Sequence, residues 1–249
     1  MAVDHQLDAD GLLTVTIDDG DKNVLVPETF EALIAALDEG PDARGVVLTG
    51  REGILSAGLD IKWMQANGRE GVHRLLERFG SCLMRWWTDP RPTVCAATGH
   101  AIAAGTMLAM ACDHAVAAEG GWWGLTETRI DFEMPAFGIA LARGNVRADR
   151  VDDLLLPGER VDAATAVEVG FADELSPPEE VVERARRRAL ELVELPPRAY
   201  GGTKQRLRGE AADTVLAGLV DDIAAVTAHL PTATDGPAAG GADEELTRG

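Results

Sequence analysis

The sequence predicts an α/β fold in which helices cross over a largely parallel sheet. The first reason is that short apolar runs closed by glycine alternate with longer segments whose apolar residues recur at helical spacing. The second is composition: 46% of the 249 residues are hydrophobic but only 4% are aromatic, so the core must rest on aliphatic side chains. This length suits one domain, or one domain with a small addition.

The first predicted unit reads strand, helix, strand. Residues 12–18, LLTVTID, alternate apolar and polar side chains as a half-buried strand does. Residues 27–40 begin with proline, carry apolar residues at helical spacing and end at glycine, which predicts a helix. Residues 44–50, RGVVLTG, are an apolar run closed by glycine and predict a buried strand.

The next units repeat the order of strand, turn and helix. Residues 54–64 read as a tight connection and residues 71–87 as a long helix. A buried strand is predicted at 92–99, followed through a small-residue loop by a helix at 106–112 and another strand at 114–118. This repetition predicts a parallel-rich sheet with helices in the crossovers.

The last third of the chain changes character. Asp162 can cap a short helix that Gly170 ends, and the segment FADEL then reads as a return strand. Helices are predicted over residues 177–195, which begin with proline and acidic side chains, and over 211–230. The expected parts of the chain are a core at 1–161, a helical C-terminal subdomain at 162–231 and a disordered tail at 232–249, rich in Pro, Gly and Ala.

The charge balance excludes some classes of partner. The formal net charge is −19 and the isoelectric point is about 4.6, which argues against nucleic acid because phosphate backbones bind basic surfaces. A small anionic ligand needs only a local basic patch. The N-terminus is polar and acidic, unlike a signal peptide, and no apolar run is long enough to span a membrane. Three cysteines without a close-spaced pair predict buried, reduced thiols and a cytoplasmic protein: Cys82, Cys95 and Cys112.

The stretch GHAIAAGTMLAMACDH, from Gly99 to His114, joins a loop of small residues to the start of an apolar helix. The first turn of a helix has backbone N–H groups without intrahelical acceptors, and the helix dipole favours negative charge there. Such a stretch can hold an anionic oxygen with its backbone alone. The alternative is that the small residues only allow a strand and a helix to pack closely.

Three segments carry a more specific pattern. VVLTGREGILSAGLDIKWM has a strand ending in Thr-Gly and a turn that reads Ser-Ala-Gly-x-Asp-Ile-Lys. PTVCAATGHAIAAGTMLAMACDHAVAA has a proline-led strand, a small-residue loop and a helix ending in Cys-Asp. WGLTETRIDFEMPAFGIALAR places Gly124, Glu127 and Pro135 at fitting positions. Together, from about residue 7 to residue 230, the chain resembles the enoyl-CoA hydratase/isomerase (crotonase) superfamily.

This resemblance implies a crotonase-like core built as a repeated ββα spiral, with a helical C-terminal subdomain that forms trimers, often paired into hexamers. It also implies an acyl-CoA thioester as the ligand, a place in fatty acid metabolism, and no metal or redox cofactor. Reactions of such thioesters pass through an enolate, whose oxygen needs fixed donors, each worth about 2.7–4 kcal/mol. By the family pattern the donors are the backbone N–H groups of Leu59 and Ala104.

Two alanines stand at positions where the family commonly has glycine. Ala103 and Ala104 both keep the backbone N–H group that an oxyanion site needs. Alanine, however, excludes some backbone angles that glycine adopts freely. The oxyanion site is therefore an expectation that depends on the backbone conformation at these residues.

The resemblance implies two glutamates in hydratases, which hold a water molecule between them. The first would stand where this chain has Met107, whose thioether has no transferable proton. The second matches Glu127, whose pKa would rise if it is buried beside Trp122, Trp123 and Leu125; the alternative is a surface glutamate after a turn. One carboxylate can move a double bond from the 3 to the 2 position by taking a proton and returning it one allylic position away. We therefore expect isomerisation with Glu127 as the base, and Met107 in an apolar acyl pocket.

Two further acids and one histidine lie close in sequence to these residues. Asp131 and Glu133 would share a face with Glu127 in an extended segment, and Asp131 would do so in a helix. Such a neighbour would raise the pKa of Glu127; the alternative is that both are solvated loop residues. His100 follows the glycine of the loop, but no nearby serine or cysteine suggests a catalytic triad.

Other residues are assigned to the ligand by the family pattern. The expected coenzyme A contacts are Ser56 and Ala57 at the adenine, Lys62 at the phosphates and Lys204, from the basic segment TKQRLR, at the tail of the cofactor moiety. The expected substrate pocket comprises Trp63, Met107, Trp123 and Asp131. The alternative for the basic segment is an ordinary solvated face.

Two other functions remain open. The chain can be a non-catalytic acyl-CoA binder that keeps the fold but has no working acid. It can also run another reaction of the superfamily, such as decarboxylation or hydrolysis of a carbon–carbon bond, with Asp131, Glu133 or His100 taking part. Turnover of an enoyl-CoA by the purified protein would exclude the binder.

Overall fold

The computed structural model describes residues 2–230. The expected disordered tail at 232–249 lies outside the described residues. The larger of the two main sheets consists of β1 (Val3–Leu7), β2 (Leu12–Ile17), β4 (Gly45–Thr49), β7 (Thr93–Ala97), β9 (His114–Ala118) and β12 (Glu174–Ser176), in that spatial order. β1 and β2 are antiparallel and the other pairs are parallel. The two central strands β4 and β7 are buried throughout, as their apolar sequences predict.

A second sheet lies beside the first and carries the loops of the candidate site. It consists of β5 (Gly53–Ser56), β8 (Gly99–Ile102), β10 (Trp122–Gly124) and β11 (Val161–Asp162), in the order β11-β10-β8-β5. β5, β8 and β10 are parallel, and β11 is antiparallel to β10. A two-stranded parallel ribbon is formed by β3 (Val24–Leu25) and β6 (Gly58–Leu59).

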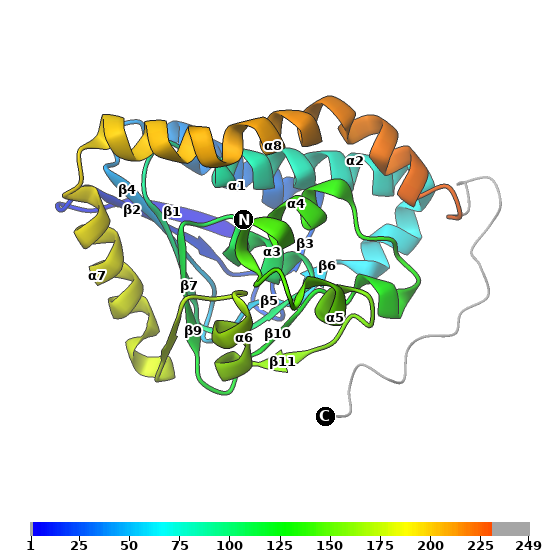
Figure 1. Cartoon of the computed structure of the whole chain (residues 1–249), viewed down its shortest axis with the longest axis horizontal. Helices are drawn as coiled ribbons and strands as arrows, with labels where there is room; N and C mark the ends of the chain where they lie inside the picture. The colour runs from blue at the N-terminus through cyan, green and yellow to red at the C-terminus, as the bar shows by residue number, and fades with distance from the viewer. Residues whose placement is uncertain (1, 231–249) are drawn as a thin grey trace.

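Helices cover both sheets (Figure 1). The first group is α1 (Pro27–Glu39), α2 (Ile61–Trp87), α3 (Ala104–Met110), the 3-10 helix η1 (Glu127–Ile130), α4 (Ala136–Asn145) and α5 (Val151–Leu155). The second group is α6 (Ala163–Val169), the 3-10 helix η2 (Pro178–Glu180), α7 (Val181–Val193) and α8 (Pro197–Val226). In Figure 1, α8 runs along the top of the molecule over α1, α2 and α4, whereas α7 packs on the larger sheet.

The order of elements repeats as the predicted ββα spiral. Each turn gives one strand to the larger sheet, one to the second sheet, and then a helix: β4, β5 and α2, then β7, β8 and α3. β8 returns the chain to the second sheet directly before α3 begins. The amino end of α3 therefore meets the ends of β5 and β10. The predicted α/β class, the parallel-rich sheet and the spiral are therefore confirmed.

Several predicted boundaries are confirmed and others are wrong, including the connection predicted at 54–64, which contains β5, β6 and the start of α2. Asp162 caps α6 by accepting a hydrogen bond from the Thr165 N–H at 2.7 Å, and Gly170 ends the helix at a φ of 96°. α2 begins ten residues earlier than predicted, because Asp60 caps it, and only Gly68 interrupts its helical backbone. α8 begins at Pro197 rather than at residue 211, and β1 was not predicted.

The C-terminal third contains strands as well as helices. β11 pairs with β10 in the second sheet, and β12 pairs with β9 in the larger one. Residues beyond 161 therefore extend both sheets of the core, while α8 packs on α2 and α4. The division of the chain into a core and a helical subdomain stays a prediction.

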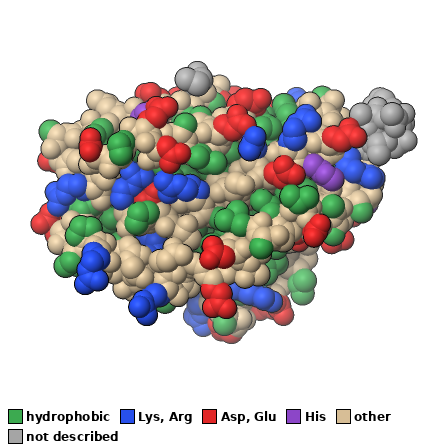
Figure 2. Space-filling view, turned by 90° about the horizontal axis from the view of Figure 1, so that it is seen from above, with side chains coloured by type: hydrophobic (Ala, Val, Ile, Leu, Met, Phe, Trp, Pro, Cys, Tyr) green, Lys and Arg blue, Asp and Glu red, His purple; other side chains and the backbone are tan. Residues whose placement is uncertain are grey.

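The cysteine and surface predictions can be compared with the structure directly. Cys82, Cys95 and Cys112 are all buried and free, as predicted. Figure 2 views the face that α8 covers and shows acidic, basic and hydrophobic side chains interspersed across it. Between residues 2 and 230, no helix is long and apolar enough to cross a membrane.

Candidate active site

The first arm of the expected oxyanion site is the turn between β5 and β6. The Ser56 hydroxyl donates to the Asn23 carbonyl at 2.7 Å and accepts from the Gly58 N–H at 3.0 Å. Asn23 is itself buried, and its amide donates to the Ile17 and Leu55 carbonyls at 2.8 and 3.1 Å. Gly58 has a φ of 101°, which a residue with a Cβ rarely adopts. These bonds fix the backbone that presents the Leu59 N–H.

The second arm is the start of α3, and its backbone is strained. Ala103 has a φ of 52° and a ψ of −114°, a conformation that glycine adopts readily and alanine does not. The backbone at this position therefore has a conformation typical of glycine, although the residue is an alanine. Ala104 is the first residue of α3, and among the described residues no acceptor meets its N–H group.

The two arms touch each other. A Cβ atom added to Gly58 would lie 3.2 Å from the Ala103 Cβ and 3.8 Å from the Ala104 nitrogen. A Cβ added to Gly105 would lie only 2.6 Å from the Ser56 carbonyl oxygen. The turn around Gly58 and the start of α3, which are far apart in sequence, are therefore in van der Waals contact, and both glycines are needed for this approach.

Thr106 connects the second arm to β10. Its buried hydroxyl lies 2.6 Å from the Ala101 carbonyl oxygen and 3.1 Å from the Gly124 carbonyl oxygen, and it accepts from the Gly124 N–H at 3.2 Å. The Ala103 N–H donates to the same Gly124 carbonyl at 2.7 Å. Three contacts therefore hold the end of β10 against the amino end of α3, and a fourth joins Thr106 to β8.

Glu127 follows Gly124 after two intervening residues and begins η1. It is 8% exposed, and its Oε2 atom is buried without a hydrogen-bond partner among the described residues. Burial raises the pKa of this carboxyl from 4.5 to about 7. The segment is anchored by Arg129, whose guanidinium donates to the Gly158 carbonyl at 2.7 Å. A buried, unpaired carboxyl that titrates near neutral pH can accept and return a proton.

The neighbouring acids do not act on Glu127. Asp131 ends η1 in a left-handed conformation with a φ of 57°, and its side chain is exposed, as is that of Glu133. The rise in the pKa of Glu127 comes from burial alone, so the hypothesis of an acidic neighbour is wrong. His100 accepts a hydrogen bond from the Trp122 N–H at 3.0 Å through Nδ1, which ties β8 to β10.

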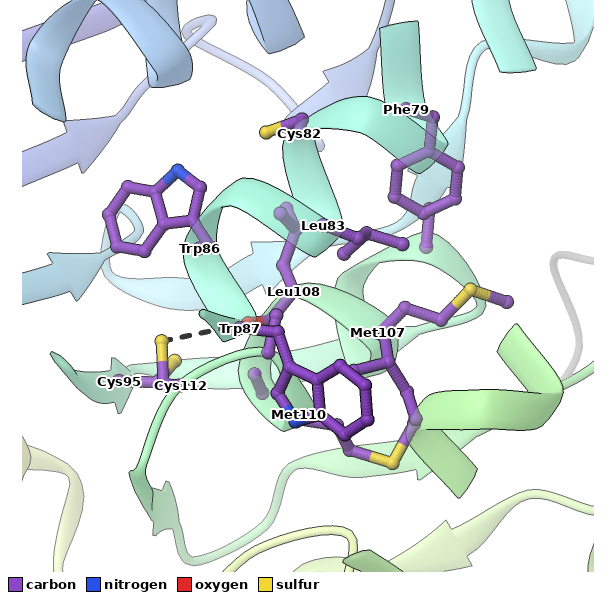
Figure 3. Packing of buried hydrophobic residues seen from close by; sticks show 14 of the residues in the cluster. Phe79, Cys82, Leu83, Trp86, Trp87, Cys95, Met107, Leu108, Met110 and Cys112 are labelled. Carbon is purple, nitrogen blue, oxygen red and sulfur yellow. Dashed lines mark hydrogen bonds between the residues drawn. The ribbon is translucent and has the colours of Figure 1, made fainter. Parts of the chain in front are cut away.

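Met107 is 1% exposed and lies among buried side chains of α2 and α3 (Figure 3). A Cβ added to Gly138 of α4 would lie 3.2 Å from the Met107 Cε and 2.4 Å from the Met134 Sδ, so thioethers fill this space. Trp123 is fully buried. Both residues are enclosed in the core, and their role in an acyl pocket stays a prediction.

Trp63 and Asp131, the other expected pocket residues, lie elsewhere. Trp63 is half-buried and lines an open hollow of about 480 Å³ between α1 and α2, together with Glu28, Glu31 and Arg74. Met107 and Trp123 do not line this hollow. The structure therefore places Met107 and Trp123 in the core, Trp63 partly buried against that core, and Asp131 in an exposed position.

Some of the residues expected to contact coenzyme A are accessible, and others are buried. Lys62 is exposed and Ala57 is partly exposed at the end of the first arm, where both are free to meet a ligand. Ser56 is completely buried, and its hydroxyl is occupied by Asn23 and Gly58. Its side chain therefore positions the arm and does not reach an adenine.

The assignment of Lys204 to the ligand is wrong. Lys204 is 5% exposed, and its ammonium group lies 2.6 Å from an Asp113 carboxylate oxygen and 2.6 Å from the Asp89 and Arg91 carbonyls. Arg208, from the same segment, lies 2.7 Å from the other Asp113 oxygen. Because α8 continues through this segment, Lys204 and Arg208 turn inward onto the turns before β7 and β9, whereas Arg206 stays exposed.

Two residues of the site escaped sequence reasoning. Asn23 and Thr106 are polar, fully buried and bonded to the backbone of the two arms. The available signal for Thr106 was a single hydroxyl at the start of an otherwise apolar helix. Asn23 adopts a φ of 51°, which asparagine tolerates better than most residues.

Comparisons with known proteins identify the family of the chain. A sequence model of the enoyl-CoA hydratase/isomerase family matches residues 8–233. The chain is 35% identical over 192 residues to a putative enoyl-CoA hydratase of Thermus thermophilus, an alignment that covers 75% of this chain and 76% of the relative.

Solved structures are similar over nearly the whole chain. An enoyl-CoA isomerase of Mycobacterium tuberculosis superposes with a TM-score of 0.84 at 31% identity, covering 90% of this chain and 98% of the other. Human mitochondrial delta3-delta2-enoyl-CoA isomerase superposes with a TM-score of 0.87 at 23% identity, covering 92% and 91%, which shows a shared fold.

Proposed function

Since the chain belongs to the enoyl-CoA hydratase/isomerase family of enzymes, we propose that it isomerises 3-enoyl-CoA thioesters to 2-enoyl-CoA thioesters with Glu127 as its single acid–base group. One observation carries the proposal: the Glu127 Oε2 atom is buried without a hydrogen-bond partner among the described residues and burial raises the pKa of this carboxyl to about 7, whereas the thioether of Met107 fills the space near α4. The names of similar proteins include both hydratases and isomerases, so the choice of reaction rests on these two side chains.

The proposed reaction needs two proton transfers. The ionised Glu127 carboxylate removes a proton from the carbon next to the thioester carbonyl, and the electron pair moves into a dienolate. The Leu59 and Ala104 N–H groups donate to the enolate oxygen, which stabilises the charge that develops there. Protonated Glu127 then returns the proton to the carbon two positions further along, and the double bond comes into conjugation with the carbonyl. No atom is gained or lost.

Hydration would require a second polar group to hold and orient water. Met107 offers a thioether, which is only a weak hydrogen-bond acceptor and cannot transfer a proton. Its side chain is 1% exposed and packs toward Gly138 and Met134. This apolar environment disfavours a bound water molecule, because such a water needs two or more polar partners.

The proposed ligand is an acyl-CoA thioester that binds as substrate, without a further cofactor. Ala57 and Lys62 are proposed to contact coenzyme A, since both are accessible at the first arm. We propose a trimer, or a hexamer of two trimers, that uses the apolar residues α8 leaves exposed: Leu207 is 77% exposed and Val220 is 64% exposed. A cytoplasmic location in fatty acid metabolism belongs to the same proposal.

The test compares two assays on purified protein. Incubation with a short-chain or long-chain 3-enoyl-CoA is expected to increase the ultraviolet absorbance of the conjugated thioester. Incubation with the corresponding 2-enoyl-CoA is expected to leave that absorbance unchanged, because no water is added. Loss of absorbance in the second assay at a rate equal to or above the isomerisation rate would overturn the proposal. Binding of enoyl-CoA without any turnover would show a non-catalytic acyl-CoA binder instead.

A substitution sharpens this test. Met107→Glu restores a second carboxyl and is expected to introduce measurable water addition to 2-enoyl-CoA. Met107→Leu is the matched control, because it keeps an apolar side chain of similar volume and is expected to keep isomerisation without hydration. A control variant that hydrates as fast as Met107→Glu would contradict the role assigned to the methionine.

A further inference from the structure

The Thr106 hydroxyl connects the start of α3 to the end of β10, two elements that are separated in sequence. Thr106 is fully buried in the first turn of α3, and its hydroxyl contacts the Ala101 carbonyl as well as both backbone groups of Gly124. Ala101 precedes the strained Ala103, and Gly124 is the last residue of β10 before the chain runs to Glu127. One side chain therefore joins the donor arm to the strand that leads to the base.

We propose that Thr106 is a positioning residue, whose hydroxyl sets the placement of the Glu127 carboxyl relative to the Ala104 N–H. The inference rests on the proposed function, because it concerns the same site. Removal of a proton requires the carboxylate and the oxyanion donors to meet one substrate molecule at the same time. A displacement of about 1 Å between such groups can lower a rate by about a hundred-fold.

Packing alone does not account for this hydroxyl. The side chains of the other residues of α3 are apolar, and a valine would fill nearly the same volume as the threonine. The hydroxyl instead matches the hydrogen-bonding needs of Gly124: it accepts from the Gly124 N–H, and its proton faces carbonyl oxygens. With valine in its place, the Gly124 N–H would lose this acceptor, and the end of β10 would be held against α3 only by its pairing with β8 and by the Ala103 N–H.

The strained backbone beside Thr106 supports the same inference. Ala103 keeps a φ of 52°, and such conformations persist only where surrounding contacts over-determine them. The Ala103 N–H and the Thr106 hydroxyl both bond to Gly124. The same residue at the end of β10 therefore contacts both the strained Ala103 and Thr106. The Thr106 hydroxyl is thus part of what holds the Ala104 N–H in its orientation.

The experiment compares Thr106→Val with Thr106→Ser, which keeps the hydroxyl, and with the control Thr93→Val. Thr93 is also fully buried, and its hydroxyl accepts from the Asp113 N–H at 3.1 Å at the start of β7. Turnover of a 3-enoyl-CoA gives kcat and KM for each variant. Difference infrared spectroscopy of the carboxyl band, with Glu127→Gln as reference, gives the ionisation of Glu127 without any substrate.

For Thr106→Val we expect kcat to fall by about a hundred-fold with KM unchanged, and the infrared titration of Glu127 to shift. Thr106→Ser should restore both, and Thr93→Val should change only thermal stability. A folded Thr106→Val enzyme with the kcat and titration of the parent would overturn the inference, as would Thr106→Ser behaving like Thr106→Val. If the valine variant does not fold, Thr106→Ala removes the same hydroxyl and is judged by the same criteria.

The infrared result separates this inference from the proposed function. A parent protein that turns over no 3-enoyl-CoA would overturn the function. The titration of Glu127 in the threonine variants would still decide whether Thr106 positions the carboxyl.

Discussion

Asp113 and Glu127 are both buried carboxyl groups, but their surroundings are opposite. The Asp113 side chain is 7% exposed and is surrounded by donors: Lys204, Arg208, the Tyr200 hydroxyl and the Thr93 N–H. Glu127 is 8% exposed and has one oxygen with no donor among the described residues. Similar burial therefore accompanies a neutralised ion cluster in one region and a carboxyl with a raised pKa in the other.

In the Asp113 region, the charged side chains pair with one another and stabilise the packing of α8. Burial lowers the pKa of Lys204, although Asp113 opposes that change, and burial together with Asp113 raises the pKa of Tyr200. Nearby Asp89 shows the same principle, because hydrogen bonds from Arg91 and Arg85 overcome its burial and hold its pKa below the ordinary value. Each buried charge there has an opposite charge in contact, which joins α8 to the turns before β7 and β9.

In the Glu127 region, local contacts do not offset the free-energy cost of burying a carboxyl or of adopting a strained backbone. It contains an unpaired buried carboxyl and two non-glycine residues at positive φ, Ala103 and Asp131. Such strain tends to gather at functional sites. The comparison teaches that the missing partner, rather than burial itself, marks a carboxyl as a candidate for catalysis, and four experiments test this distinction.

The largest expected effect is on turnover when the unpaired carboxyl is removed. Glu127→Gln should lower kcat for a 3-enoyl-CoA by about a thousand-fold or more, because the only proposed base is lost. Binding of the thioester, measured by calorimetry, should persist. Glu133→Gln, which alters an exposed acid close in sequence, serves as the control and should retain full activity. Equal activity in the two variants would show that Glu127 is not the catalytic base.

The next effect concerns the paired carboxyl. Asp113→Asn should destabilise the protein by about 3–5 kcal/mol, because it leaves the buried Lys204 and the partly buried Arg208 without their counter-charge. Urea unfolding measures the loss. Asp149→Asn is the control: it breaks the exposed ion pair with Arg147 and should cost about 0–1 kcal/mol. The structural role of Asp113 would be refuted by a loss no larger than that of the control.

The third effect is a pH dependence of stability. The folded-state pKa of Glu127, about 7, lies above its ordinary value of 4.5, so the folded protein binds a proton that the unfolded chain releases. This contribution is fully present below pH 4.5 and is lost as the pH rises through 7. Relative to Glu127→Gln, the parent should lose about 3 kcal/mol between these limits. Denaturant unfolding of both proteins at several pH values measures it, and parallel stability curves would show that Glu127 is not desolvated.

The smallest effect concerns the strained backbone near Glu127. Ala103→Gly should stabilise the protein by about 1 kcal/mol, since relief of the positive φ exceeds the entropy that glycine adds to the unfolded chain. Ala109→Gly, inside α3, is the control and should destabilise by about 0.5–1 kcal/mol. Thermal unfolding measures both, and destabilisation by Ala103→Gly would mean that Ala103 is not strained.

The sequence by itself determined the fold and the identity of the candidate base. Alternating strand and helix periods, with caps such as Asp162 and Gly170, act over a few residues and were read correctly. The positions of Leu59, Ala104 and Glu127 followed from motif spacing, and their catalytic roles stay predictions. Met107 was likewise identified from the sequence as an apolar residue where an acid was expected.

Only the tertiary structure decided which polar residues turn inward and what they meet. Lys204 and Ser56 looked like ligand contacts, but each is buried against partners far away in the chain. Thr106 gained its contacts because β10 ends against the start of α3. The pKa of Glu127 was likewise decided by packing. Local patterns specify helices and strands, whereas burial and charge pairing depend on which distant elements come together, and no single segment contains that information.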